Sequence, residues 1–561
     1  MSSSRTHAER AELTGHAHIP LEGERQTGRT DPDEDIAVTL LLRRRRELPD
    51  IHEHLGHLLP EEKKQKHMTQ LGLSERHGAT SESFAAVERF AKEHKLKIVA
   101  HTNSHRAITL NGSSATIEKA FGVRLVEMEQ NHRRYRVPEG RLSVPRELSE
   151  TVQAVVGLST RPFAKRVAVH HKGAHLPFWT VQQMAEAYGF APQRSAKSRR
   201  IALIELGGGY HEEDLRQYFT SAGVPMPKLR CVSVDGAQNL PAPKSHIKLL
   251  LDAVEGKCEF SEIPQDALSS AQCTIEVTMD IELAGALAPG AEIIVYMAPA
   301  TEHGILSALH KAIANDHELP DAISISWGEP EIGVSEAIRN SIEETLREAA
   351  LLGVTVCASS GDEGALNGSS DGTPTVNFPA SSPHVLSCGG TSVEKVGTGV
   401  REAVWNCSQH GIRGASGGGV SRYFSTPKWQ HDHGVPLAPT GMKGRGVPDV
   451  AGPADPHRGC AILVGGEWCS SAGTSAVAPL WAALVACLNS ELGTRCGYIT
   501  PLLYRFSRTE KSSLREITEG DNGFYQARRG WNACTGLGSP EATHLASALR
   551  GKPGKIHSKA S

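Results

Sequence analysis

The chain has 561 residues, of which 39% are hydrophobic and 22% charged, and 55 are glycine. This composition is typical of a globular protein of about two to four domains and excludes collagen, coiled coil and wholesale disorder. The net charge of −3 provides no basic field for nucleic acid, and no apolar run approaches the roughly 18–20 residues of a membrane span. The 11 cysteines begin at Cys231 and form no C-x-x-C pair, which predicts buried thiols rather than a disulfide framework or a zinc ribbon.

The first 160 residues predict a polar lead-in followed by a small domain. Residues 1–34 contain no apolar core of a signal peptide, and we expect them to be disordered. Over residues 35–160, alternating and helical hydrophobic patterns predict a compact α+β domain, with a turn at Asn111-Gly112 and a solvated strand end at the basic run 43–46. The expected strands are 36–42, 96–100, 107–110, 123–128 and 135–137, and the expected helices are 84–91 and 114–121.

The remaining chain has a different pattern. Residues 161–177 carry basic and histidine side chains without periodicity, which predicts a linker. Beyond it, apolar runs at 201–206, 293–297, 322–327 and 354–359 alternate with helical segments. That alternation predicts a parallel sheet with crossover helices over residues 178–550. A surface insertion is expected at about 239–272, and residues 551–561 form a polar tail.

The sharpest chemical feature is the turn Gly473-Thr474-Ser475, which opens an apolar helix. A serine at a helix start lies near the positive end of the helix dipole, which favours negative charge developing at its Oγ. The alternative interpretation is an ordinary N-cap serine. No His-Gly-Thr-His-like motif supplies a histidine base for this serine.

Two acidic motifs can provide the proton transfers for which no histidine base is present. Glu276 and Asp280 are four residues apart, so their carboxyl groups lie on one helix face and are expected to share a proton at acid pH. Such a pair can take a proton from Ser475 and return it to a leaving amine. Asp362 follows an expected parallel strand and, when protonated, can donate to an oxyanion. The alternatives are a solvated helix face and a turn aspartate beside Gly361.

Taken in order, Glu276-x-x-x-Asp280, Ser360-Gly361-Asp362 and Gly473-Thr474-Ser475 resemble the sedolisin family of serine-carboxyl peptidases. The resemblance covers nearly the whole chain, because residues 35–160 are similar to the activation prodomain of that family. It implies a subtilisin-like, doubly wound parallel sheet preceded by a smaller α+β prodomain. Further matching motifs occupy residues 204–210, 324–328, 416–421, 445–450 and 534–540.

The resemblance also implies residue roles. Ser475 would be the nucleophile, Glu276 its general base and then acid, and Asp280 the residue that orients Glu276. Asp362 would donate to the oxyanion together with the Ser475 backbone N–H. Glu205 and Trp327 match positions that extend the hydrogen-bond chain behind Asp280.

A calcium ion near the C-terminus is a further property implied by the resemblance, with aspartate carboxylates and backbone carbonyls as ligands. The matching residues are Glu516, Ile517, Gly530 and Asn532, so one aspartate is replaced by glutamate and the other by asparagine. Because calcium affinity falls with ligand charge, two interpretations stay open. One is a calcium site, and the other is a metal-free loop braced by Arg528 and Arg529.

The sequence therefore predicts an acid-acting endopeptidase that cleaves itself in the linker and then cleaves protein or peptide substrates. Its own prodomain is the expected intramolecular inhibitor, and protonation of linker histidines His170, His171 and His175 is one hypothesis for release. We expect a monomer without nucleic-acid or membrane partners, secreted by family resemblance although no signal peptide is visible. The alternatives are an inactive binding protein on the same fold, and an esterase or amidase that pairs Ser475 with a histidine.

Overall fold

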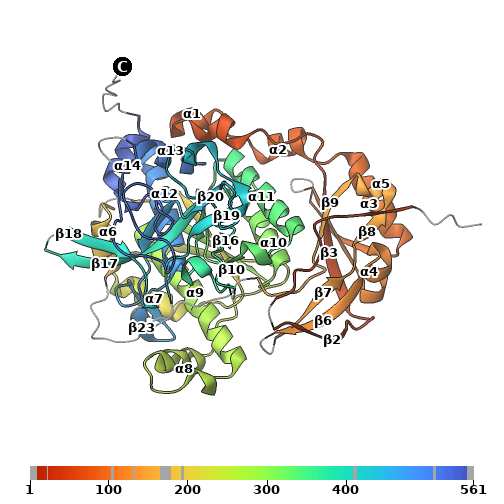
Figure 1. Cartoon of the computed structure of the whole chain (residues 1–561), viewed down its shortest axis with the longest axis horizontal. Coiled ribbons are helices and arrows are strands. Elements are labelled where there is room, and N and C mark those ends of the chain that lie inside the picture. Colours follow the sequence, from red (N-terminus) through yellow and green to blue (C-terminus); the bar gives the residue numbers. More distant parts are fainter. Residues whose placement is uncertain are drawn as a thin grey trace, which may run out of the picture.

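The computed structural model describes residues 9–21, 23–102, 106–130, 133–163, 179–190, 195–369, 371–397, 399–408, 414–508 and 513–551. These residues form a smaller N-terminal α+β domain and a larger C-terminal α/β domain that lie side by side (Figure 1). Most of the predicted linker at 161–177 and of the predicted tail at 551–561 lies outside the described residues, including His170, His171 and His175.

An antiparallel sheet of order β4-β5-β3-β9 forms the core of the N-terminal domain. The strand β3, between β5 and β9, carries the alternating apolar residues of the sequence. The helices α3 and α4 pack their apolar faces on this sheet. The Asn111-Gly112 turn prediction is wrong, because these residues pair with Ala37 and Ile36 inside β5. The elements are β3 (Asp35–Leu42), α3 (Ser81–Glu93), β4 (Lys97–Thr102), β5 (Ala107–Ser113), α4 (Ser114–Phe121) and β9 (Val152–Val156).

Polar strands of the lead-in complete two smaller sheets. β1 (Arg10–Glu12) pairs with β8 (Ser143–Pro145), and β2 (Arg25–Arg29) pairs with β6 (Arg124–Gln130), the partner of β7 (Arg133–Glu139). The prediction of disorder is therefore wrong for residues 9–21 and 23–34. Their side chains are mostly exposed, but their backbone groups obtain hydrogen bonds from strands more than 90 residues away, which the local composition does not reveal.

The C-terminal domain is built on an eight-stranded sheet of order β11-β12-β10-β13-β15-β17-β18, with β21 also paired to β17. Every pair is parallel except β17 with β18. The strands are β10 (Arg200–Leu206), β11 (Lys228–Ser233), β12 (Glu292–Ala298), β13 (Ala322–Ile325), β15 (Thr355–Ser359), β17 (Leu386–Val396), β18 (Gly399–Val404) and β21 (Val450–Pro453).

Helices cover both faces of this sheet, as predicted for a doubly wound fold. Ile201 and Leu203 of β10 belong to the core shared with α9 (Gln265–Leu287) and α12 (Val477–Leu492). Ala202 and Ile204 face the other core, which includes α10 (Glu302–Ile313) and α11 (Glu336–Leu351). Successive residues of a strand point to opposite faces, so this alternation places one layer of helices on each side of the sheet.

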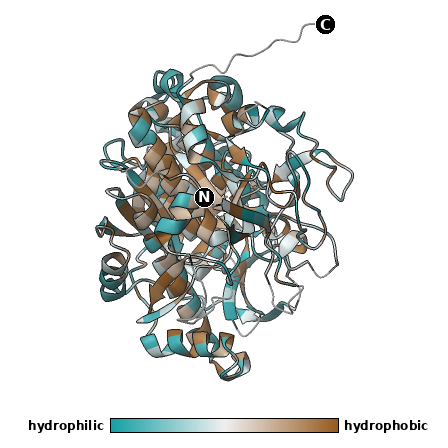
Figure 2. Ribbon diagram, turned by 90° about the vertical axis from the view of Figure 1, so that its left-hand side faces the viewer, coloured by the Kyte–Doolittle hydropathy of each residue, from teal (hydrophilic) through white to brown (hydrophobic). Residues whose placement is uncertain are grey.

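The helix α12 is the core helix of the domain. With the preceding turn it is, among the described residues, the one helix long and apolar enough to cross a membrane, but 83% of that segment is buried in the protein. It packs against α9, β13 and β15. Hydrophobic residues, brown in Figure 2, gather on the inner strands and helices, while hydrophilic residues cover much of the outside. All 11 cysteines are unpaired, and eight of them are buried.

The predicted insertion lies at the surface. It contains α8 (Lys244–Val254) and the short helix η2 (Phe260–Glu262), and it ends in the first turns of α9. These helices project from the C-terminal domain below α9 in Figure 1.

The two domains meet across α10 and α11, which face the N-terminal domain (Figure 1). Arg44 contradicts the prediction of a solvated strand end, because its side chain is 3% exposed and bonds to Glu344, at 2.6 Å, and to Glu348 of α11. On the N-terminal side, α1 (Pro60–Lys64) buries Lys63, whose ammonium donates to the Cys496 and Tyr498 carbonyls at 3.1 and 2.5 Å. The basic run thus contributes to an interface that sequence periodicity does not show.

Candidate active site

Ser475 lies in the short helix η7 (Thr474–Ala476), directly before α12. The preceding Gly473 has φ of +78°, a backbone conformation that favours glycine. The Ser475 side chain lies at the positive end of the core helix and is only 6% exposed. Its Oγ donates to the Ser326 carbonyl at 3.2 Å, so the predicted serine turn at a helix start is confirmed.

The two acids of α9 are inside the protein rather than on a solvated face. Glu276 is 2% exposed and Asp280 is fully buried. The Ser326 hydroxyl donates to Asp280 Oδ2 at 2.6 Å and lies 3.2 Å from the Ser475 carbonyl. The turn η7 packs on α9. Ser326 connects the two elements, because its hydroxyl bonds to Asp280 and its carbonyl accepts from Ser475 Oγ.

Asp362 follows β15 at the carboxyl end of the sheet and is bound to the same turn. Its Oδ1 accepts hydrogen bonds from the Thr474 backbone N–H at 2.7 Å and from Thr474 Oγ1 at 2.8 Å. The Gly361 N–H donates to Thr474 Oγ1 at 3.1 Å. Two chain segments, separated by more than 100 residues in sequence, therefore bring Asp362 next to the residue that precedes Ser475.

Glu205 and Trp327 form a buried hydrogen bond between neighbouring strands. The Trp327 indole N–H donates to Glu205 Oε2 at 3.2 Å, where β10 lies beside the end of β13. Glu205 is fully buried and Trp327 is 3% exposed. Trp327 follows Ser326 in the chain, so this pair supports the strand end that carries the Asp280 contact.

Two contacting residues were not singled out by the sequence analysis. Ser326 lies within the quoted motif 324–328, and Thr474 lies within the serine turn. The signal for Ser326 is its place after a buried parallel strand, since such strand ends form the sites of α/β sheets. No local pattern shows that its hydroxyl bonds to an aspartate 46 residues earlier.

The four residues of the predicted metal site form a closed hydrogen-bonded loop. Glu516 Oε1 accepts from the Gly530 N–H at 3.1 Å, and Asn532 Nδ2 donates to the Ile517 carbonyl at 3.2 Å. Asn532 Oδ1 accepts from three donors of residues 534 and 535. The Asn532 amide group directs a proton at the Ile517 carbonyl, which a calcium ion would need as a ligand. These residues therefore do not fit a calcium ion.

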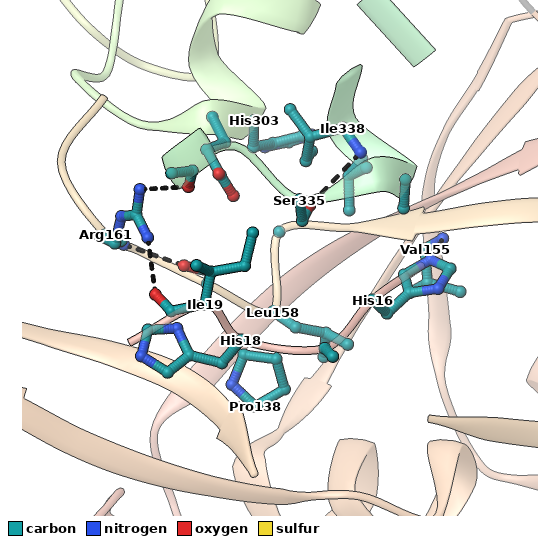
Figure 3. Close-up of a pocket in the computed structure, with 17 residues that line it drawn as sticks. His16, His18, Ile19, Pro138, Val155, Leu158, Arg161, His303, Ser335 and Ile338 are labelled. Carbon is teal, nitrogen blue, oxygen red and sulfur yellow. Dashed lines mark hydrogen bonds between the residues drawn. The ribbon is translucent and has the colours of Figure 1, made fainter. Parts of the chain in front are cut away.

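A pocket at the domain junction is lined by residues of the lead-in and of both domains (Figure 3). His16 Nε2 accepts from the Val155 N–H at 3.0 Å, while its Nδ1 lies 2.9 Å from the Thr14 carbonyl. Only the neutral tautomer with the proton on Nδ1 satisfies both contacts. Burial lowers the pKa of His16, and burial raises the pKa of Glu302, which lines the same pocket, to about 7.

Hydrogen bonds to backbone carbonyl groups also cross this junction. The Gly15 carbonyl accepts from the Ala337 N–H at 3.0 Å. The Arg161 guanidinium donates to the Ile19 carbonyl at 3.2 Å and to the Gly333 carbonyl at 2.5 Å (Figure 3). The lead-in therefore joins the two domains instead of extending away from them.

Comparison with known proteins agrees with this architecture. The model of the family "Pro-kumamolisin, activation domain" matches residues 22–161, and that of the subtilase family matches residues 271–502. The chain is 39% identical to kumamolisin from Bacillus sp. (strain MN-32), over 96% of each chain. It belongs to the sedolisin family. The chain is thus a kumamolisin-like serine peptidase, synthesised as a proenzyme with an activation domain.

More distant relatives share the fold. Sedolisin from Pseudomonas sp. (strain 101) is 25% identical to this enzyme, over 79% of this chain and 75% of its own. The solved structure of Pseudomonas sedolisin, a serine-carboxyl proteinase with two bound molecules of pseudo-iodotyrostatin, matches with a TM-score of 0.57 at 24% identity. That match covers 68% of this chain and 100% of the solved chain, and it confirms the subtilisin-like fold.

Proposed function

We propose that this enzyme is an acid-acting endopeptidase that uses Ser475, Glu276 and Asp280 as a triad and Asp362 as the oxyanion donor. The observation that carries the proposal is the convergence on η7 of residues from three distant segments. Ser326 bonds both to Asp280 and to Ser475, and the residue before Ser475 bonds to Asp362. Burial removes water from these groups, which strengthens their electrostatic interactions.

Each residue has a defined task in this mechanism. Ser475 Oγ attacks the peptide carbonyl carbon while its proton passes to the Glu276 carboxylate. The resulting oxyanion accepts from the Ser475 backbone N–H and from the carboxyl proton of Asp362. Glu276 then returns its proton to the leaving amine as the C–N bond breaks, and water releases the acyl group by the same steps in reverse. Asp362 can donate only in its protonated form, which requires acid.

The described contacts favour this proposal over the two alternatives. A binding protein without activity has no need of all four residues, which are present here and buried or half-buried around one turn. An esterase or amidase mechanism needs a histidine beside the nucleophile. Within the described ranges, Ser475 Oγ bonds to the Ser326 carbonyl, and no histidine is hydrogen-bonded to it.

We also infer that the activation domain inhibits the enzyme until acid weakens the contact between domains. Arg133 of β7 donates to Ser269 of α9, the helix that carries Glu276. Buried Arg44 bonds to Glu344 and Glu348 across this contact. Burial lowers the pKa of His16, so this residue is neutral until the solution is acidic, and once protonated it could no longer accept from Val155. The hypothesis that linker histidines His170, His171 and His175 control release stays a prediction.

The loop containing Glu516, Ile517, Gly530 and Asn532 is, we infer, held without calcium. Its own amide and carboxylate groups make the contacts described above, and Arg528 adds a bond to the Gly434 carbonyl. This supports the metal-free interpretation of the two that the sequence left open.

The decisive experiment follows self-cleavage of the purified full-length chain by mass spectrometry after a shift to about pH 4. Ser475→Ala and Glu276→Gln are expected to prevent both self-cleavage and cleavage of an added peptide, because one site performs both. The matched control is Glu186→Gln, at an exposed position of α6 (Val181–Ala187), and it should process normally. Maturation of pure Ser475→Ala protein would contradict the assignment.

A further inference from the structure

A cluster of three metal-binding side chains lies outside the catalytic turn. Cys407 follows β18, while Asp455 and His457 lie in the loop after β21. The Cys407 Sγ is 3.8 Å from Asp455 Oδ1, and His457 Nδ1 is 3.1 Å from the same oxygen. The three candidate ligand atoms all lie within 4.8 Å of one another.

Two of these separations are close to the edges of a tetrahedral zinc site, and the third, between Cys407 Sγ and His457 Nδ1, is at most 4.8 Å. Zinc lies about 2.3 Å from cysteine sulfur and about 2.0–2.1 Å from histidine nitrogen or carboxylate oxygen, which gives edges of about 3.3–3.6 Å. The sulfur–oxygen and nitrogen–oxygen distances of the cluster fall within about 0.3 Å of that range. Cysteine, histidine and aspartate are all zinc ligands, and a set of three leaves the fourth position to water.

Neighbouring groups orient these ligands. The Trp405 indole N–H donates to Cys407 Sγ at 3.2 Å, a contact that suits a metal-bound thiolate. The Ser392 hydroxyl donates to Asp455 Oδ2 at 2.6 Å and so turns the other oxygen, Oδ1, toward the cluster. Such outer contacts fix ligand orientation in metal sites and affect their affinity.

We propose that Cys407, Asp455 and His457 bind a thiophilic divalent cation, with zinc as the first choice. On binding, the Cys407 S–H bond breaks, its proton goes to solvent, and a sulfur–zinc bond forms. His457 binds through Nδ1 and carries its proton on Nε2. The ion has a path to the site, because the His457 side chain is 34% exposed and that of Asp455 is 12% exposed.

The bound ion would join two loops that reach the catalytic turn. The Ala454 carbonyl, directly before Asp455, accepts from the N–H of Gly473 at 2.9 Å. On the other side, the Cys407 N–H donates to the Gly414 carbonyl at 2.8 Å, and the next residue, Ala415, donates to the Asp362 carbonyl at 2.9 Å. Zinc is therefore expected to stabilise the folded enzyme through contacts that do not depend on its catalytic mechanism.

The test uses the full-length Ser475→Ala chain, reduced and freed of metal by a chelator, at neutral pH. Zinc alone is titrated by calorimetry, and cobalt alone is followed by its thiolate charge-transfer absorption. We expect one zinc per chain that excess calcium does not displace, and a cobalt complex with the thiolate band. Cys407→Ser should abolish the band and lower zinc affinity at least tenfold, and His457→Asn should lower affinity similarly.

The matched control is Cys231→Ser, which removes an exposed thiol on β11 and should leave both signals unchanged. Absence of zinc binding would overturn the proposal and leave Asp455 as a turn residue that accepts from the His457 N–H. Loss of the band in Cys231→Ser, or its survival in Cys407→Ser, would overturn it too. If Cys407→Ser fails to fold, His457→Asn decides, with metal-free melting curves as the check on folding.

Discussion

Glu282 provides a direct test of how this fold responds to acid. It lies in α9, two residues after Asp280, and is fully buried. Its Oε2 accepts from the Leu463 N–H at 2.9 Å, whereas Oε1 accepts no hydrogen bond from the described residues. Burial, and to a smaller extent the charge of Asp214, raises the pKa of Glu282 well above its usual value.

The sign and size of the effect follow from the two states of the carboxyl group. In the unfolded chain it ionises near pH 4.5, whereas in the fold it keeps its proton to higher pH. The fold is therefore favoured fully below about pH 4.5 and loses about 1.4 kcal/mol per pH unit above it. Between pH 4.5 and 7 the loss is at most about 3.4 kcal/mol, if the folded group stays protonated throughout.

Glu282→Gln should remove this loss, because glutamine has the same shape, keeps an acceptor for Leu463 and does not titrate. We expect the variant to match its parent at pH 4 and to exceed it in free energy of unfolding by up to about 3 kcal/mol at pH 7. The assay is urea unfolding of Ser475→Ala chains at four pH values, followed by tryptophan fluorescence. The exposed Glu186→Gln serves as control. A difference that does not change with pH would refute the reasoning.

Three further predictions concern the catalytic donor, the domain interface and the metal. Asp362→Ala should lower kcat by about 10²–10³, while near wild-type turnover would make Asp362 only a turn residue. Arg44→Met removes the buried cation that bonds to both Glu344 and Glu348, at a cost of about 3–5 kcal/mol. It should raise the pH midpoint of self-cleavage, measured by mass spectrometry, relative to exposed Arg25→Met; an unchanged midpoint would exclude this contact as a control of release. Calcium chloride added in excess to the chelator-treated wild type should leave its melting temperature unchanged, because Asn532 already bonds to Ile517, and a rise would contradict this.

Much of the fold could be predicted because its signals are local. The helical spacing of Phe84, Val87 and Phe90 fixes the buried face of α3, and the structure confirms it. In β3 the alternation holds only at the start, because Leu41 is buried as well and packs in the core that includes α10 and α11. The order of buried strands and helices from β10 onward likewise predicts the parallel sheet. Within the site, the serine turn was recognisable because Gly473, Thr474 and Ser475 are consecutive.

The features that sequence reasoning missed all depend on distant partners. β1 and β2 are short and polar, and only their pairing with β8 and β6 makes them strands. Arg44 has the sequence context of an exposed residue, yet α11 supplies carboxylates about 300 residues later. The bond from Ser326 to Asp280 joins a strand end to a helix, and a linear sequence contains no sign of such a contact.

The unpaired cysteines affect how long the folded enzyme persists. Eight of the 11 thiols are shielded inside the protein, so global unfolding in air at neutral pH would expose all of them to oxidation and to mispairing. Refolding would then compete with covalent trapping, and unfolding becomes irreversible. At acid pH few thiols ionise, and the exchange slows. The lifetime of the enzyme at neutral pH is therefore set by its unfolding rate rather than by its equilibrium stability.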